Sequence, residues 1–270
     1  MRAVSGVSDP SAPLRFPVRY GLADLTPDPE RPQGWLLSVN GVPQSYVDLD
    51  DPGYLRFEYV RYLAFIVESL SPGTLEALHI GAGAFTLARY LAHTRPGSPQ
   101  LAFEPDGELV EIVRERLGLE EIPLLRVSGS DGRLGVAECA AGSFDLVVLD
   151  AWKAAEMPPE LSTAEFLTDV ARVLRTGGCL AANLADGPDL VFARRIAATA
   201  REAFPHALLL ADEAVLGGLV YGHIILACSP TPGAISAIAD RVALQGSSRL
   251  TCLHGDDLES FRGQASPFRD

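Results

Sequence analysis

From residue 76 onward, short apolar segments alternate with amphipathic ones, and this alternation restricts the fold more than any other feature of the chain. We predict strands at 76–80, 100–104, 123–128, 144–150 and 179–184, with helices at 85–93, 107–117, 163–174 and 189–204. Strands that alternate with helices form a parallel sheet covered on both faces. The sequence therefore predicts a Rossmann-like α/β fold.

Two further apolar segments, 207–211 and 219–227, are separated only by a short glycine-containing loop. The loop is too short for a helical crossover, so the two segments are predicted to pair as antiparallel strands. Such a C-terminal pair is typical of the sheet of S-adenosylmethionine-dependent methyltransferases, whereas a nicotinamide-binding Rossmann sheet is all parallel. Residues 234–244 are predicted to form one more helix, and the polar tail beyond them is expected to be loosely held.

The N-terminal part has a different character. It is rich in proline as far as Gln33, which favours extended segments, and Asn40-Gly41 separates the short apolar segments 35–39 and 42–48 as in a tight hairpin. A helix is predicted at 54–70, leading into the main sheet. We therefore expect a small N-terminal β segment at 1–50 and a Rossmann-like domain at 51–270.

Composition limits the partners. The net charge of −13 argues against a nucleic-acid partner, which would require clustered Lys and Arg, and is compatible with a cationic substrate. Residues 1–13 lack the features of a signal peptide, and no apolar stretch of about 18 residues occurs. We expect a soluble cytoplasmic protein with no membrane contact. Its four scattered cysteines indicate neither a disulfide framework nor a zinc site.

The candidate ligand site lies where the first strand meets its helix. Gly81 and Gly83 follow the strand at 76–80, where glycine lets a ligand approach the backbone at a helix N-terminus. The dinucleotide fingerprint would have a third Gly or Ala at Thr86, which counts against a dehydrogenase. A tight turn without a ligand is the alternative interpretation.

Three acids follow three successive strands. Glu104 stands about twenty residues beyond the glycines, where a carboxylate accepts from both ribose hydroxyls. Asp131 is placed to accept from an adenine amino group, although a plain turn aspartate fits this residue nearly as well. Asp150 ends the strand at 144–150 and is expected in the same crevice. The histidines His79 and His223 are both predicted to be core or edge positions rather than bases or ligands.

The order of these segments resembles the spermidine synthase family, aminopropyltransferases that use decarboxylated S-adenosylmethionine. The similar motifs are Val39-Asn40-Gly41-Val42-Pro43-Gln44, Ile80-Gly81-Ala82-Gly83, Glu104-Pro105-Asp106 and Ser130-Asp131-Gly132. The resemblance implies that Gln44, Gly81, Gly83, Glu104 and Asp131 contact the cofactor and that Asp150 is catalytic. It also implies a small-molecule substrate such as a polyamine, methylthioadenosine as product, no metal, and a homodimer.

Two departures from the family pattern affect the chemistry. Ala84 stands where the family has an aspartate in the glycine loop, and Lys153, in Asp150-Ala151-Trp152-Lys153-Ala154, replaces the aspartate that deprotonates the amine. Lys153 would repel a cationic substrate by about 1 kcal/mol or more at contact distance. Glu156 is an alternative base or a solvated loop acid, and Trp152 and Tyr54 are candidates for a changed acceptor channel.

These departures predict poor transfer to putrescine. They leave two alternatives open: an S-adenosylmethionine-dependent methyltransferase, and a non-catalytic homologue that binds a nucleoside or a partner.

Overall fold

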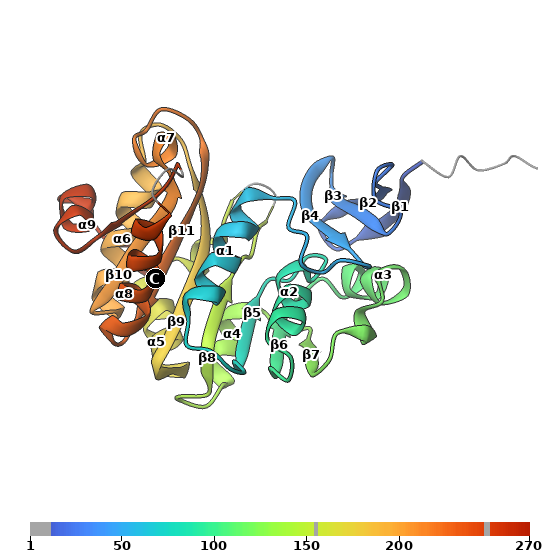
Figure 1. Ribbon diagram of the computed structural model, residues 1–270, viewed down its shortest axis with the longest axis horizontal. Helices are drawn as coiled ribbons and strands as arrows, with labels where there is room; N and C mark the ends of the chain where they lie inside the picture. The colour runs from blue at the N-terminus through green and yellow to red at the C-terminus, as the bar shows by residue number, and fades with distance from the viewer. Residues whose placement is uncertain (1–11, 154–155, 246–248) are drawn as a thin grey trace, which may run out of the picture.

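The computed structural model describes residues 12–153, 156–245 and 249–270, so residues 1–11 and Ala154 of the sequence predictions lie outside it. The chain forms a four-stranded and an eight-stranded sheet (Figure 1). Its strands and helices are β1 (Leu14–Val18), β2 (Gly21–Pro27), β3 (Gly34–Val39), β4 (Val42–Asp48), α1 (Glu58–Ser69), β5 (Ala77–Ile80), α2 (Thr86–Thr94), β6 (Gln100–Phe103), α3 (Gly107–Leu117), β7 (Leu125–Ser128), α4 (Gly132–Glu138), β8 (Phe144–Leu149), α5 (Ala164–Val173), β9 (Leu174–Asp186), α6 (Val191–Ala203), β10 (His206–Asp212), α7 (Glu213–Leu216), β11 (Gly222–Ser229), α8 (Pro232–Leu244), β12 (Leu250–His254) and α9 (Gly255–Arg262).

The eight-stranded sheet confirms the predicted α/β class. Its order is β12-β10-β11-β9-β8-β5-β6-β7, and the pairs from β9 to β7 are parallel. The predicted antiparallel pairing of β10 with β11 is present, with β11 also antiparallel to β9. The N-terminal end of β11 therefore lies beside the carboxyl ends of the parallel strands.

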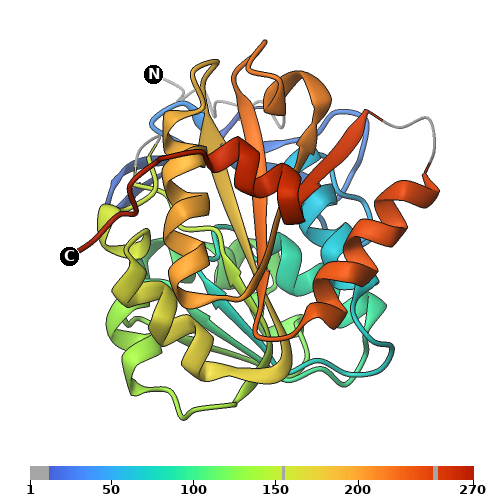
Figure 2. The same cartoon turned by 90° about the vertical axis from the view of Figure 1, so that its left-hand side faces the viewer.

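The prediction of a loosely held tail is wrong. β12 pairs with β10 along five residues, and Leu258 of α9 is only 2% exposed. Figure 2 shows α9 and the C-terminal segment lying against α6, and the backbone N–H of Ala164 donates to the carbonyl of Phe268. The sequence pattern missed these elements because both are short and α9 is mostly polar, so tertiary contacts rather than periodicity stabilise them.

The two faces of the sheet are covered by different helices. In β8, Leu146 and Val148 belong to the core under α1, α2 and α8, whereas Val147 and Leu149 belong to the core under α4, α5 and α6. Successive side chains of a strand point to opposite faces, so both faces of this strand must be apolar. This explains the continuous apolar segment in the sequence.

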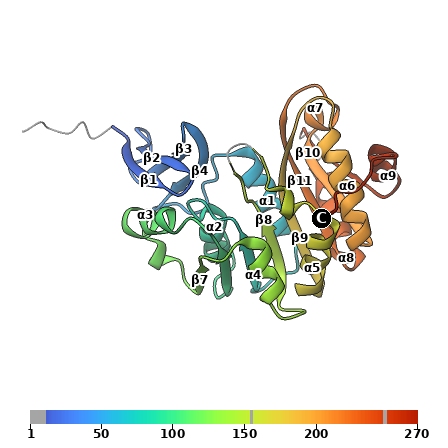
Figure 3. The same ribbon diagram turned by 180° about the vertical axis from the view of Figure 1, so that it is seen from behind.

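The four-stranded sheet is an antiparallel meander in the order β1-β2-β3-β4. Its tight turn is formed by Asn40 and Gly41, whose φ angles are 52° and 79°, as the hairpin prediction requires. Leu25 and Leu37 pack with α2 and α3 in one hydrophobic cluster. This contact holds the small sheet beside α2 and α3 at one end of the molecule (Figure 3).

Candidate functional site

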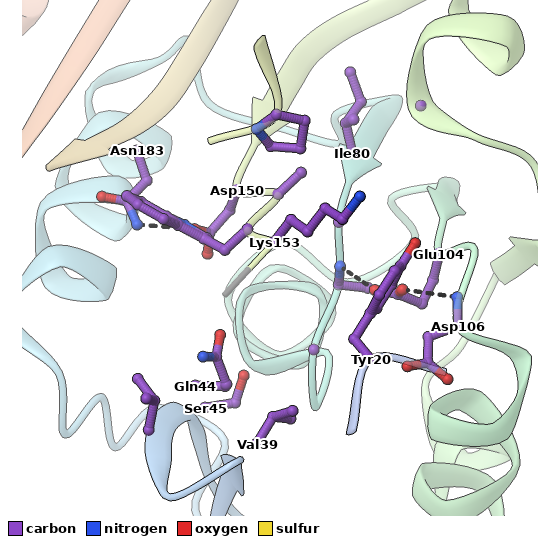
Figure 4. Close-up of a pocket in the computed structure, with 18 of the residues that line it drawn as sticks. Tyr20, Val39, Gln44, Ser45, Ile80, Glu104, Asp106, Asp150, Lys153 and Asn183 are labelled. Atoms are coloured by element: carbon purple, nitrogen blue, oxygen red, sulfur yellow. Dashed lines mark hydrogen bonds between the residues drawn. The ribbon is translucent and has the colours of Figure 1, made fainter. Parts of the chain in front are cut away.

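A cavity of about 800 Å³ lies between the four-stranded sheet and the carboxyl ends of the parallel strands. All six residues that the sequence singled out line it: Gln44, Gly81, Gly83, Glu104, Asp131 and Asp150. The structure thus brings together residues as far apart in the chain as Gln44 and Asp150. Figure 4 shows Gln44 and Ser45 on one side of this cavity and Glu104 and Asp150 on others.

The glycine loop is held close to two other segments. A Cβ atom at Gly81, whose φ is +78°, would lie 2.5 Å from the carbonyl oxygen of Asp150. A Cβ atom at Gly83 would lie 2.4 Å from Oγ of Ser45, which accepts from the backbone N–H of Ala84. Because the close atoms at Gly81 belong to the backbone, glycine is required there for packing as well as for the left-handed conformation, whereas at Gly83 the Ser45 side chain could move.

Glu104 ties the loop to the next strand. One carboxylate oxygen accepts from the N–H of Ala82 at 3.0 Å, and the other accepts from the N–H of Asp106 at 3.1 Å. Burial raises the pKa of Glu104, and these backbone N–H groups oppose that rise. Because each oxygen can accept a second hydrogen bond, the carboxylate remains able to bind two hydroxyls.

Asp131 and Asp106 both cap helices. Asp131 Oδ1 accepts from the N–H of Arg133, and Asp106 Oδ1 accepts from the N–H groups of Leu109 and Arg19. Asp131 is therefore the N-cap of α4, and its position on the cavity also allows contact with a ligand. Asp106, which the sequence analysis named only within a motif, attaches the N-terminal sheet to α3.

Asp150 is the centre of a hydrogen-bond network. Its Oδ1 accepts from Nε1 of Trp152 at 2.9 Å and from Nδ2 of Asn183 at 2.8 Å. Asn183 Oδ1 lies 3.0 Å from Nδ1 of His223. Burial raises the pKa of Asp150, whereas the hydrogen bonds from Asn183 and Trp152 lower it. Among the described residues no donor reaches Oδ2, which leaves that oxygen to a ligand.

His223, which the sequence predicts to be a core or edge position, was not predicted to line the cavity. His223 lines the cavity and stacks on Tyr59, with ring centroids 4.6 Å apart. The antiparallel pairing would have indicated this position, because the first residues of a strand antiparallel to β9 must lie beside the carboxyl ends of the parallel strands. His79, by contrast, is buried beside Gln100 as expected.

The charge of the cavity is uneven. Six acids line it, namely Glu58, Glu104, Asp106, Asp131, Asp150 and Glu160, and Lys153 is the only Lys or Arg among its described lining residues. Lys153 is also the only lysine of the chain. Figure 4 shows its side chain extending across the cavity from beside Asp150. The six carboxylates make the cavity attractive to cations, whereas the ammonium group of Lys153 repels cations close to it.

Three other candidates from the sequence lie away from the cavity. Ala84 is fully buried in the cluster under the N-terminal sheet, so an aspartate there would be buried too. Tyr54 packs against Tyr46 and Arg31, and neither Tyr54 nor Glu156 is among the described lining residues. Trp152 remains as the aromatic wall next to Asp150.

The described residues contain no group of three or more His, Cys, Asp or Glu side chains arranged to hold a metal ion. In the same part of the chain, no helix combines the length and the apolar character that crossing a bilayer requires.

Comparison with known proteins gives three informative similarities. A crystal structure of a probable spermidine synthase from Corynebacterium glutamicum is 31% identical, covers 97% of each chain and has a TM-score of 0.86. A spermidine synthase in complex with the transition state analogue AdoDATO is 16% identical, covers 87% of this chain and 79% of that chain, and has a TM-score of 0.65, a likeness of fold alone.

The third similarity is to a curated protein. A polyamine aminopropyltransferase from Chromobacterium violaceum is 26% identical over 142 residues, which are 52% of this chain and 53% of that protein. The chain thus spans about half the length of the curated relative it matches. No protein-family model matches the sequence.

Proposed function

The chain belongs to the spermidine synthase family, and from that premise we propose that it transfers an aminopropyl group from decarboxylated S-adenosylmethionine to an amine. The observation that carries this proposal is the single acidic cavity in which the glycine loop, Glu104, Asp131 and Asp150 meet. A sulfonium donor and an ammonium acceptor are both cations, and an acidic cavity favours both.

The residues present fit an adenosyl group. Gly81 and Gly83 leave backbone exposed at the start of α2, and Glu104 keeps acceptor capacity for two ribose hydroxyls. Asp131 faces the same cavity for an amino group of the base, and Gln44 approaches from the hairpin. The bound donor would supply a carbon made electrophilic by the neighbouring sulfonium. The remaining work of the protein is positioning and exclusion of water.

The acceptor half of the cavity surrounds Asp150. Its free Oδ2 can bind an ammonium head, and Trp152, Tyr59 and His223 form aromatic walls beside it. Lys153 occupies the same region with a positive charge. We therefore infer that an amine with one cationic end is a better acceptor than putrescine, whose second ammonium group would approach Lys153.

Calorimetric titration tests the proposal. We expect decarboxylated S-adenosylmethionine and methylthioadenosine to bind, and mass spectrometry to detect an aminopropyl adduct of butylamine or putrescine. Tighter binding of intact S-adenosylmethionine with formation of a methylated product would instead establish the methyltransferase alternative. Nucleoside binding without any transfer would favour the non-catalytic homologue, and failure of all three nucleosides to bind would overturn the adenosyl site. Sedimentation would test the predicted homodimer.

A further inference from the structure

His223 lies at the acceptor end of the cavity because of the strand order. It is the second residue of β11, and it pairs with Ala185 near the end of β9. β11 is antiparallel to β9, so its first residues lie at the same end of the sheet as Asp150, which directly follows β8. Its imidazole ring stacks on Tyr59 and meets the edge of the Trp152 ring, at centroid distances of 4.6 Å and 6.0 Å.

The hydrogen bonds around Asp150 fix which nitrogen of His223 carries its proton. The indole N–H of Trp152 can only donate, so Asp150 Oδ1 is an acceptor. Asn183 therefore directs its amide nitrogen to Oδ1, and its amide oxygen must accept from Nδ1 of His223. In the neutral ring Nε2 is then left with a lone pair.

Burial of the ring favours its neutral form. It lowers the pKa of His223, while the charges of Asp150 and Glu58 and a hydrogen bond to the backbone of Leu184 act in the opposite direction. The other group with a titratable proton next to the ring, the Tyr59 hydroxyl, donates to the carbonyl of Gln44, and burial holds its pKa well above its usual value. Tyr59 is thus unsuited to accept a proton, whereas Nε2 of His223 is available.

We propose that His223 is the base of this site: its Nε2 takes the proton of the acceptor ammonium before the amine attacks. This inference rests on the proposed function. In the step, the N–H bond of the ammonium breaks and an N–H bond forms at Nε2. The freed lone pair then bonds to the carbon beside the sulfonium, and the C–S bond electrons pass to sulfur. The imidazolium is stabilised through Asn183 by the negative charge of Asp150 and later returns its proton to solvent.

His223→Gln is the first test, since glutamine retains a donor toward Asn183 and cannot accept a proton. With decarboxylated S-adenosylmethionine and putrescine as probes, we expect the single-turnover rate to fall by about 100-fold or more. Methylthioadenosine affinity should be unchanged. Added imidazole should partly restore the rate of His223→Ala, which a purely structural role would not allow. His93→Gln, an exposed histidine on α2, is the matched control and should behave like the parent protein.

A second measurement does not depend on turnover. Long-range ¹⁵N–¹H spectra of histidine-labelled protein should show His223 protonated at Nδ1 only, and its Nε2 signal should shift when putrescine is added with methylthioadenosine. Asn183→Leu should release this tautomer. A proton on Nε2, or an undiminished rate in His223→Gln, would overturn the proposal. Failure of the parent protein to bind methylthioadenosine would overturn the proposed function instead, and the tautomer would still decide whether His223 can act as a base.

Discussion

Glu104 holds the glycine loop through Ala82 and is placed to hold a ribose as well. We predict that Glu104→Gln weakens methylthioadenosine binding by about 1.5 to 3 kcal/mol, the cost of losing hydrogen bonds to a charged acceptor. Calorimetry measures this loss, and Glu108→Gln, an exposed acid on the neighbouring α3, is the control. Equal affinities in the two variants would exclude Glu104 from the ligand site.

The raised pKa of Glu104 also predicts a pH dependence. In the folded state this carboxyl binds its proton more tightly than in the unfolded chain, whose value is near 4.5. Its contribution to folding is therefore most favourable below 4.5 and is lost as the pH rises through the raised pKa. Nucleoside affinity should change in the opposite direction, because hydroxyls donate to the ionised form. Measurements of unfolding free energy and of methylthioadenosine affinity between about pH 4 and pH 8 should show both trends in the parent protein and neither in Glu104→Gln.

Lys153 places a positive charge where the acceptor amine must bind. The parent protein should convert putrescine well below about 1 per second, the lower part of the ordinary range for enzymes. Lys153→Asp should raise this rate, because it removes repulsion and adds a carboxylate. Lys153→Arg, which keeps the charge, should not. Equal rates in all three proteins would show that this side chain does not reach the acceptor.

At the scale of elements, the loop from β5 to α2 is limited by its contact with the end of β8. Gly81→Ala would combine a left-handed backbone with a Cβ atom 2.5 Å from a backbone oxygen. Gly142 has a similar φ of +65° but open space around it, so Gly142→Ala isolates the cost of the backbone conformation. We predict that Gly142→Ala costs about 1 to 2 kcal/mol of unfolding free energy and that Gly81→Ala costs more.

Denaturant unfolding compares these two alanine variants. Only Gly81→Ala should also reduce methylthioadenosine binding, because only that loop lines the cavity. If Gly81→Ala lowered the unfolding free energy no more than Gly142→Ala does, the close approach of the loop to Asp150 would not be needed.

At the scale of the whole molecule, the two sheets share one hydrophobic cluster. Leu25 of β2 is fully buried against α2 and α3, whereas Leu22 on the same strand is 40% exposed. Leu25→Ala should cost about 2 to 5 kcal/mol, as for other buried leucines, and Leu22→Ala far less. Because the cluster joins the sheets, we expect a single thermal transition with equal calorimetric and van't Hoff enthalpies. Two separate transitions would instead support independent units divided near residue 50.

The type of most elements and much of the site could be predicted from the sequence. The periodicity of the apolar residues and the length of each segment predicted the parallel strands and their helices, since these properties are local. Because the carboxyl ends of parallel strands lie at the same end of the sheet, Gly81, Glu104 and Asp150 could be predicted to lie close together without any knowledge of contacts. The turn at Asn40 and Gly41 was equally local, because only a few residue types tolerate positive φ angles.

The contacts of those residues, by contrast, depend on how distant segments pack. The base candidate His223 depends on β11 pairing with β9, and its free nitrogen depends on the chain of donors from Trp152 through Asn183. The burial of Ala84 and the order of β12 and α9 likewise come from packing between segments far apart in the chain. A local pattern specifies an element because backbone geometry repeats over a few residues, whereas a hydrogen-bond network forms only after distant segments have been brought into contact.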